Sequence, residues 1–356
     1  MEPVRIGIIG CGVIGSRHAD AAARSTQIEL VALADVRSEV AQALAATVGC
    51  ATVYDAAEAL LADGRIEGVV LAMPAHLRTA LAQQAFAAGK HVLTEKPVAL
   101  NSAEVQTLLD AQGDRVAACC SSRYHFLEAT STVKAFVAGG ALGALREVRC
   151  RAIVPAGAPP RQPPPPWRLN RALNGGGILM NWGCYDLDYL LGITGWSLHP
   201  QTVLAQCWGT PPDYAAYAAP GSDAETHVTA LVRCAGGVVI SYERAEFIAA
   251  QRELAWELIG DRGSLRLQMT PAPDGRMVHF QADATTGVVA STLCTAQEEH
   301  SSVHDGPIND FALAIRTGST PQTSFARALI IQQITDAIYA SAATGTAVAI
   351  PEGILP

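Results

Sequence analysis

The sequence lacks any apolar run close to the roughly 20 residues that a helix needs to cross a bilayer. It also lacks an excess of basic residues, because 25 lysines and arginines face 33 acidic residues and leave a net charge of −8. This balance argues against nucleic acid or an anionic membrane surface as a partner. The N-terminus enters a strand-like segment at once, without the layout of a signal peptide. We therefore expect a cytoplasmic protein.

Cysteines are present but show no pattern. None of the nine belongs to a CxxC pair, and the histidines show no metal-ligand spacing with cysteine, aspartate or glutamate. We expect reduced, buried thiols and no bound metal. A length of 356 residues, 49% hydrophobic and 16% charged, suits two folded domains rather than one core or a disordered chain.

The first 120 residues alternate between short apolar strands and helices, which is the pattern of a parallel sheet covered on both faces. Strands are expected at 4–9, 28–34, 69–73, 91–94 and 116–121. Two helices should begin at capping boxes, one formed by Asp55 and Glu58 and one by Asn101 and Glu104.

After residue 122 one helix is expected at 128–138, and strand patterns then dominate up to a last helix at 325–342. The segments 228–234 and 238–242 predict a hairpin, and 256–259 pairs with 264–267 around another turn. The predicted fold class is therefore α/β plus α+β. A doubly wound parallel sheet should occupy residues 1–123, and a domain with a large, mostly antiparallel open sheet should occupy 124–356.

A glycine-rich turn, GCGVIG, joins the first strand to the first helix. Gly10 permits the tight turn, Gly12 lets a pyrophosphate approach the backbone, and Gly15 lets the helix pack closely on the strand. The helix N-terminus, which includes Val13 and Ile14, offers N–H groups to the phosphates. The turn therefore predicts a bound nicotinamide dinucleotide.

Asp35 ends the second strand, twenty residues after Gly15. A carboxylate there accepts hydrogen bonds from the ribose hydroxyls of NAD and repels the 2′-phosphate of NADP. Arg37 lies nearby, and an arginine can pair with that phosphate. We expect NAD, with NADP as the alternative.

A first polar segment, Glu95-Lys96-Pro97, follows a parallel strand at the edge where open α/β sheets bind ligands. A lysine there can help to deprotonate a hydroxyl or hold a carbonyl oxygen.

A second polar segment begins with three glycines at 175–177, which free a helix N-terminus to approach another backbone or a ligand. Asn181, Tyr185 and Asp188 then share one helix face. A buried tyrosine and asparagine can also simply satisfy each other, so the residues alone leave both interpretations open.

Together these segments resemble the glucose–fructose oxidoreductase, inositol dehydrogenase and rhizopine-catabolism (Gfo/Idh/MocA) family over nearly the whole chain. The segments that carry the resemblance are GCGVIG at 10–15, AMPAHLRTALAQQAFAAGKHVLTEKPVAL at 72–100, SSRYH at 121–125, WRLN at 167–170, GGGILMNWGCYDLD at 175–188 and INDFALAIRTG at 308–318.

The resemblance implies a Rossmann domain followed by an α+β domain whose open sheet joins subunits into a homodimer or homotetramer. It implies hydride transfer between a nicotinamide and a secondary alcohol or ketone of a sugar, glycoside or cyclitol. Lys96 is then the active-site lysine. Residues near the cofactor are Met73, Pro74, His76, Glu95 and Lys96, and residues near the substrate are Arg123, Tyr124, Trp167 and Arg168.

The sequence departs from the family at two central positions, where Asn181 and Tyr185 replace the common aspartate and histidine. A carboxylate supports a histidine base but would raise the pKa of a tyrosine, so the double change is coherent. We expect Tyr185 as the acid/base, Lys96 as its cationic partner, and Asn181 and Asp188 as ligands of substrate hydroxyls. In the alternative, Lys96 moves the proton and Tyr185 only positions the substrate.

Arg78 also departs from the family, which often has histidine at this position, in a region expected to face the adenine of the cofactor. Two other functions stay open. One is a glycoside hydrolase or lyase that retains its NAD through transient oxidation and elimination, and the other is a non-catalytic sugar sensor.

Overall fold

The computed structural model describes residues 2–162, 164–272, 275–295 and 303–351, which form two compact units. Within these ranges the first unit takes in 2–123 and 303–329, and the second takes in 124–295 and 330–351. The predicted second domain, 124–356, is therefore too long, because 303–329 belongs to the first unit. Among the described helices, none combines the length and apolar character required to cross a membrane.

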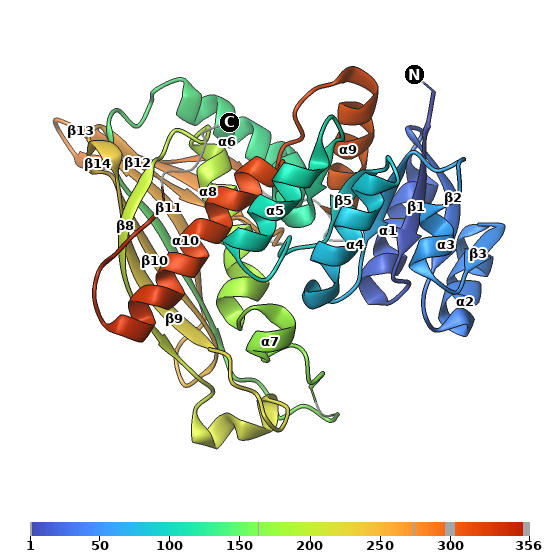
Figure 1. Ribbon diagram of the computed structural model, residues 1–356. Helices are drawn as coiled ribbons and strands as arrows, with labels where there is room; N and C mark the ends of the chain where they lie inside the picture. Colours follow the sequence, from blue (N-terminus) through green and yellow to red (C-terminus); the bar gives the residue numbers. More distant parts are fainter. Residues whose placement is uncertain (1, 163, 273–274, 296–302, 352–356) are drawn as a thin grey trace. The chain divides into compact units, whose positions relative to one another are not determined.

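The first unit contains a parallel sheet in the order β3-β2-β1-β4-β5-β6 (Figure 1). Its strands are β1 (Val4–Ile9), β2 (Ile28–Ala34), β3 (Thr52–Tyr54), β4 (Gly68–Leu71), β5 (His91–Thr94) and β6 (Ala117–Cys119). Its helices are α1 (Val13–Arg24), α2 (Ser38–Val48), α3 (Ala57–Leu61), α4 (Ala75–Ala87), α5 (Ser102–Gln112) and α9 (Asp305–Thr317), and η1 (Cys120–Phe126) is a 3₁₀ helix at its boundary. The order reverses at β1, and ligands bind beyond the carboxyl ends of such strands.

Two apolar cores cover the two faces of this sheet. One core joins side chains of α1, α2 and β1 to Ile308 and Phe311 of α9. The other joins α3, α4 and α5 to Phe325 and Leu329, at the start of α10 (Phe325–Thr344). Burial on both faces explains why these strands read as continuous apolar runs.

One predicted helix cap is confirmed and the other is wrong. The Asn101 side chain accepts a hydrogen bond from the Glu104 backbone N–H at 2.9 Å and caps α5. At α3 the N-cap is Ala56, with no side-chain cap, so the box expected from Asp55 and Glu58 does not form. The helix begins two residues after Asp55, which removes the required spacing.

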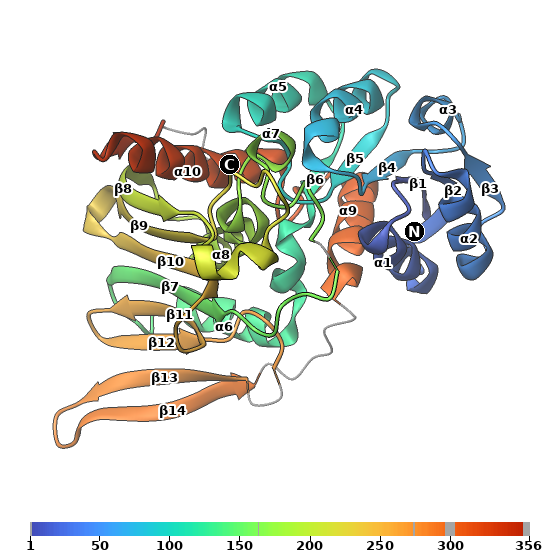
Figure 2. The same ribbon diagram turned by 90° about the horizontal axis from the view of Figure 1, so that it is seen from below.

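The second unit contains a nine-stranded sheet in the order β14-β13-β12-β11-β7-β10-β9-β8-β15. Its strands are β7 (Leu145–Pro155), β8 (Pro200–Trp208), β9 (His227–Cys234), β10 (Val239–Ile248), β11 (Glu253–Gly260), β12 (Gly263–Leu267), β13 (Arg276–Asp283), β14 (Gly287–Thr295) and β15 (Val348–Ala349). All neighbours pair antiparallel except β7 and β10, which pair in parallel, so the sheet is mostly antiparallel as predicted. Figure 2 shows the β13–β14 hairpin at its edge.

The helices of the second unit are α6 (Glu128–Ala138), α7 (Arg171–Asn174), the π-helix η2 (Leu179–Gly183), α8 (Cys184–Ile193) and the greater part of α10, with short 3₁₀ turns η3 (Pro212–Tyr217) and η4 (Ala235–Gly237). Burial alternates along β9, so one face of the sheet is covered and the other is exposed. Ser341 of α10 accepts a hydrogen bond from the Ala205 N–H of β8, which shows that α10 packs against this sheet.

Candidate active site

The glycine turn has the geometry that a dinucleotide requires. Gly10 has a φ of 94°, which favours glycine, and a Cβ on Gly15 would lie 1.9 Å from the Gly10 carbonyl oxygen. A Cβ on Gly12 would meet nothing within 4 Å, so the backbone there has open space beside it. Gly12 is also the N-cap of α1, where no side-chain cap takes the first N–H groups. Open space at a helix N-terminus fits a pyrophosphate.

Asp35 lies at the carboxyl end of β2, beside this turn. Its Oδ2 accepts a hydrogen bond from the Cys11 N–H at 2.8 Å, and its Oδ1 accepts one from the Arg37 N–H at 2.9 Å. The Arg37 side chain is mostly exposed, with Nε 3.6 Å from the carboxylate, so solvent screens the pair. The carboxylate therefore has a fixed place, whereas the guanidinium is only loosely held.

The segment after β4 combines exposed residues with a buried arginine. His76 and Pro74 are exposed and Met73 is half-buried, but Arg78 is buried in the first unit. Its Nε donates to the Met73 carbonyl at 2.8 Å, and its Nη1 donates to the Glu95 carbonyl at 3.0 Å and to the Pro97 carbonyl. Arg78 thus holds the backbone of two segments, one at Met73 and one at Glu95 and Pro97.

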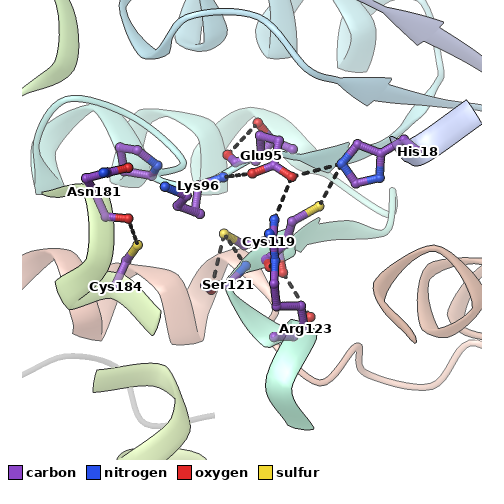
Figure 3. A network of polar contacts seen from close by, with 12 residues as sticks. His18, Glu95, Lys96, Cys119, Ser121, Arg123, Asn181 and Cys184 are labelled. Atoms are coloured by element: carbon purple, nitrogen blue, oxygen red, sulfur yellow. Dashed lines mark hydrogen bonds and ion pairs between the residues drawn. The ribbon is translucent and has the colours of Figure 1, made fainter. Parts of the chain in front are cut away.

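Glu95 is the centre of a buried ion-pair network (Figure 3). Its carboxylate, 3% exposed, accepts hydrogen bonds from His18 Nε2 and Arg123 Nη2, both at 2.9 Å, and from the Lys96 backbone N–H at 3.2 Å. Burial alone would raise the pKa of Glu95, but the Arg123 and His18 contacts hold that pKa well below its usual value. Glu95 therefore remains ionised beneath Lys96.

This network includes two residues that were expected at ligands. Glu95 was expected to touch the cofactor and Arg123 the substrate, and their side chains are buried and bonded to each other. The following residue, Lys96, is partly exposed, and its peptide bond to Pro97 is cis. Sequence reasoning missed His18, which lies 77 residues from Glu95 and carries no local signal of its partner.

The ligand atoms of His18, Glu95 and Cys120 lie within 4.8 Å of one another, a spacing that could hold a metal ion. Their surroundings argue against one. Burial and the Glu95 charge raise the pKa of the Cys120 thiol well above its usual value. The Arg123 guanidinium already neutralises the carboxylate.

In the second unit the triple glycine packs against another backbone rather than leaving a ligand site. A Cβ on Gly177 would lie 1.8 Å from the Glu225 carbonyl oxygen. The buried Glu225 carboxylate accepts hydrogen bonds from the N–H groups of Gly177 and Leu179, both at 3.0 Å. Glu225 therefore caps the helix that begins at Leu179, as anions do at helix N-termini. The sequence pattern did not reveal this partner.

Tyr185 and Asn181 lie on the first turns of that helix. Asn181 is partly exposed within η2, whose π-helical turn alters the expected helical spacing. Tyr185 is buried, with its ring edge-on to Tyr124 and to Trp182, each with centroids 5.5 Å apart. Tyr124, expected near substrate, is thus packed against the predicted acid/base residue.

Asp188, which was expected at a substrate hydroxyl, has a protein partner. Its side chain is completely buried, and its Oδ1 accepts a hydrogen bond from His125 Nε2 at 2.9 Å. The same nitrogen lies 3.0 Å from the Asp188 carbonyl oxygen. Helical spacing placed Asp188 near the face of Tyr185 but did not show that a histidine of η1 covers it.

Another buried carboxylate, Asp186, which sequence reasoning missed, fixes α8 on the sheet. Asp186 accepts hydrogen bonds from Arg244 at 3.0 Å, from Trp256 at 3.0 Å and from Tyr242 at 3.1 Å. Burial raises the pKa of Asp186 and Arg244 opposes that rise. The Arg244 guanidinium also lies 4.6 Å from the ring centroid of Trp182, so the network orients the aromatic neighbour of Tyr185.

Trp167 and Arg168 lie on the loop before α7. Trp167 is exposed, whereas Arg168 pairs with the buried carboxylate of Glu246 and lies over the Phe247 ring, 5.3 Å from its centroid. Burial raises the pKa of Glu246, and Arg168 opposes that rise. Arg168 is therefore oriented by a carboxylate that the sequence did not single out.

Comparison with known proteins identifies the family. The model described as an oxidoreductase family with an NAD-binding Rossmann fold matches residues 4–119, and the Gfo/Idh/MocA C-terminal domain matches 130–266. A dTDP-3,4-didehydro-2,6-dideoxy-alpha-D-glucose 3-reductase of Streptomyces violaceoruber is 31% identical over 77% of this chain and 75% of its own length. Levoglucosan dehydrogenase of Pseudarthrobacter phenanthrenivorans is 25% identical over 99% of both chains.

A solved structure of levoglucosan dehydrogenase in complex with NADH and L-sorbose superposes with a TM-score of 0.84. It is 22% identical and covers 98% of this chain and 99% of that chain, so this likeness describes the fold. The two matched domain models, with the relative that is 31% identical, establish the family. The chain belongs to the Gfo/Idh/MocA family of oxidoreductases, and its first unit is an NAD-binding Rossmann domain.

Proposed function

We propose that this oxidoreductase transfers a hydride between NAD and a secondary alcohol or ketone of a sugar, glycoside or cyclitol. The observation that carries the proposal is the set of groups that follow β1, β2 and β5 of one parallel sheet. These are the open backbone at Gly12, the Asp35 carboxylate and the partly exposed Lys96. Relatives named as a dTDP-sugar reductase and a levoglucosan dehydrogenase support the substrate class.

Asp35 favours NAD over NADP in this proposal. Its carboxylate is held by two backbone N–H groups, so it is positioned to accept hydrogen bonds from a ribose diol. A 2′-phosphate would meet that negative charge, and the exposed Arg37 offers only a screened positive one.

The proposed chemistry needs one proton transfer beside the hydride transfer. A bound nicotinamide would supply the acceptor for the hydride of the carbinol carbon in oxidation and the donor in reduction. Tyr185 takes the hydroxyl proton during oxidation and gives it back during reduction, Lys96 supplies a positive charge that favours the phenolate, and Asn181 bonds a substrate hydroxyl. In the alternative assignment Lys96 itself moves the proton.

We also propose that the chain assembles as a homodimer or homotetramer through the exposed face of the nine-stranded sheet. Leu204 of β8 and Leu231 of β9 are paired across the strands and are 52% and 54% exposed. Trp208, 46% exposed, extends this apolar surface.

The test is incubation of the purified protein with NAD⁺ and with NADP⁺ against a panel of sugars, glycosides and cyclitols, followed by absorbance of the reduced cofactor. We expect turnover of at least one member with NAD⁺, and ketosugar reduction with NADH. The proposal would be contradicted if neither oxidation nor reduction of any panel member occurred with NAD or with NADP. Glycoside cleavage without net reduction of the cofactor would instead support a hydrolase or lyase that retains its NAD.

A further inference from the structure

We propose that Arg78 is a positioning residue that fixes the backbone of Lys96 to the segment at Met73 and Pro74. The inference rests on the proposed function, because it gives Arg78 a purpose only if Lys96 serves the reaction and Met73 and Pro74 lie at the cofactor. The proposed role of Arg78 requires no contact with substrate or cofactor.

The geometry joins two separate loops through one side chain. Arg78 lies in the first turn of α4 and is 7% exposed. It donates to the Met73 carbonyl, beyond β4, and to the Glu95 and Pro97 carbonyls, beyond β5. β4 and β5 are neighbours in the sheet, so the guanidinium ties together the carboxyl ends of two adjacent strands. Arginine presents its donors on separate nitrogens of a planar fork, so Nε reaches one loop while Nη1 reaches the other, whereas a lysine offers all its donors from one nitrogen.

The bonded carbonyls flank Lys96 on both sides in the chain. The Glu95 side chain is anchored separately by Arg123 and His18. The main chain on either side of Lys96 is therefore held by Arg78, while the preceding side chain is held by a different cation. A lysine between two anchored neighbours has a defined backbone position, and pre-organisation of this kind affects rate more than stability.

A simpler role is also open to a buried arginine, since its charge can merely satisfy carbonyls that would otherwise lack partners. The first unit also contains a buried cation, Lys90, that serves as an example of this simpler role. Lys90, also 7% exposed, donates from Nζ to the carbonyls of Asp63 and Ile66, both at 2.8 Å. It lies just before β5, whereas Lys96 lies just after it. Lys90 is thus a buried cationic clamp at the opposite end of the strand.

The experiment compares Arg78→Met, Arg78→Lys and Lys90→Met in the full chain. Three measurements are made: kcat and KM, the dissociation constant of NADH from its fluorescence, and amide hydrogen exchange of the peptide covering residues 91–100. For Arg78→Met we expect kcat to fall about 10- to 100-fold, the effect of a displacement near 1 Å. We also expect weaker NADH binding and faster exchange after β5. Arg78→Lys should be intermediate, because one ammonium cannot serve both loops.

Lys90→Met should lower the thermal midpoint but leave kcat, NADH affinity and exchange after β5 close to wild type. The inference is overturned if Arg78→Met and Lys90→Met change kcat equally, or if exchange at 91–100 is unchanged in Arg78→Met. If Arg78→Met does not fold, Arg78→Lys decides by the same readouts.

A Lys96→Met variant separates failure of the inference from failure of the proposed function. Wild-type activity in Lys96→Met would remove Lys96 from the reaction, whatever the Arg78 variants do. If no substrate is turned over, or NADH does not bind to the wild type, the proposed function fails, and hydrogen exchange still decides whether Arg78 fixes the segment.

Discussion

Asp35 joins the glycine turn to the residues that follow β2, since its two carboxylate oxygens accept hydrogen bonds from Cys11 and Arg37. Substitution Asp35→Ala should weaken NADH binding about 10- to 100-fold, because hydrogen bonds to a charged group contribute roughly 1.5–3 kcal/mol. NADPH should gain affinity relative to NADH, since the repulsion of the 2′-phosphate is removed. Fluorescence titration with both cofactors measures the ratio.

Arg37→Ala is the control for that measurement and should leave NADH affinity nearly unchanged, because the Arg37 side chain is mostly exposed. An NADH/NADPH ratio that stays constant in Asp35→Ala would show that cofactor choice depends on another residue.

Tyr185 can be separated from the other tyrosine of α8 by paired substitutions. Tyr185→Phe should lower kcat by about 10²–10⁴, the usual range for a lost general acid/base, with NADH affinity retained. Tyr189→Phe changes a buried ring one turn along the same helix and should leave kcat near wild type. Steady-state kinetics on the substrate found in the panel provides the measurement. An unchanged kcat in Tyr185→Phe would favour Lys96 as the proton-transfer group.

At the scale of secondary structure, short-range patterns predicted the elements well but not the partners of buried charges. The helix at Val13–Arg24 and the strand at Ile28–Ala34 follow from apolar periodicity within a few residues. His18 lies 77 residues from its partner Glu95, and Arg244 lies 58 residues from its partner Asp186, so no local pattern encodes either pair. Asp188 shows the same limit, because helical spacing gives a shared face but not what covers it.

Helix α9 is fastened to the first sheet by a titratable ion pair. Glu67 accepts hydrogen bonds from Arg316 of α9, which lower the pKa of Glu67 from 4.5 to about 2. A depressed carboxyl pKa contributes stability above pH 4.5, and the contribution disappears as pH falls toward 2. Glu67→Gln should therefore lower the free energy of unfolding by about 1 kcal/mol at pH 7, allowing for solvent screening of the pair.

Denaturant unfolding at several pH values between 7 and 3 checks this expectation. The difference between wild type and Glu67→Gln should shrink steadily below pH 4.5. Asp114→Asn is the control, because Asp114 is highly exposed beside Arg115 and should show no such trend. A difference that is constant with pH would mean that the Glu67 charge does not stabilise α9.

At the scale of the whole molecule, we expect that one substitution on the exposed face of the second sheet will change the oligomeric state. Leu231→Glu places a charge within the apolar surface formed with Leu204, so we expect the native mass to fall toward that of one chain. Leu313→Glu alters an exposed leucine of α9 and should leave the mass unchanged. Light scattering after gel filtration measures both, and an identical mass for Leu231→Glu and wild type would exclude this face.

The first unit is built from two stretches of the chain, which are synthesised at different times. All six strands of its sheet have been synthesised by Cys119, yet Phe311 and Phe325, which complete its two cores, are added only after strand β14 of the second unit. Part of the apolar surface of the first sheet therefore stays uncovered while strands β7 to β14 of the second sheet are synthesised. A gene fragment ending at residue 123 would encode a sheet without its last covering helices. Any exchange of cofactor domains with a relative must accordingly transplant both stretches together.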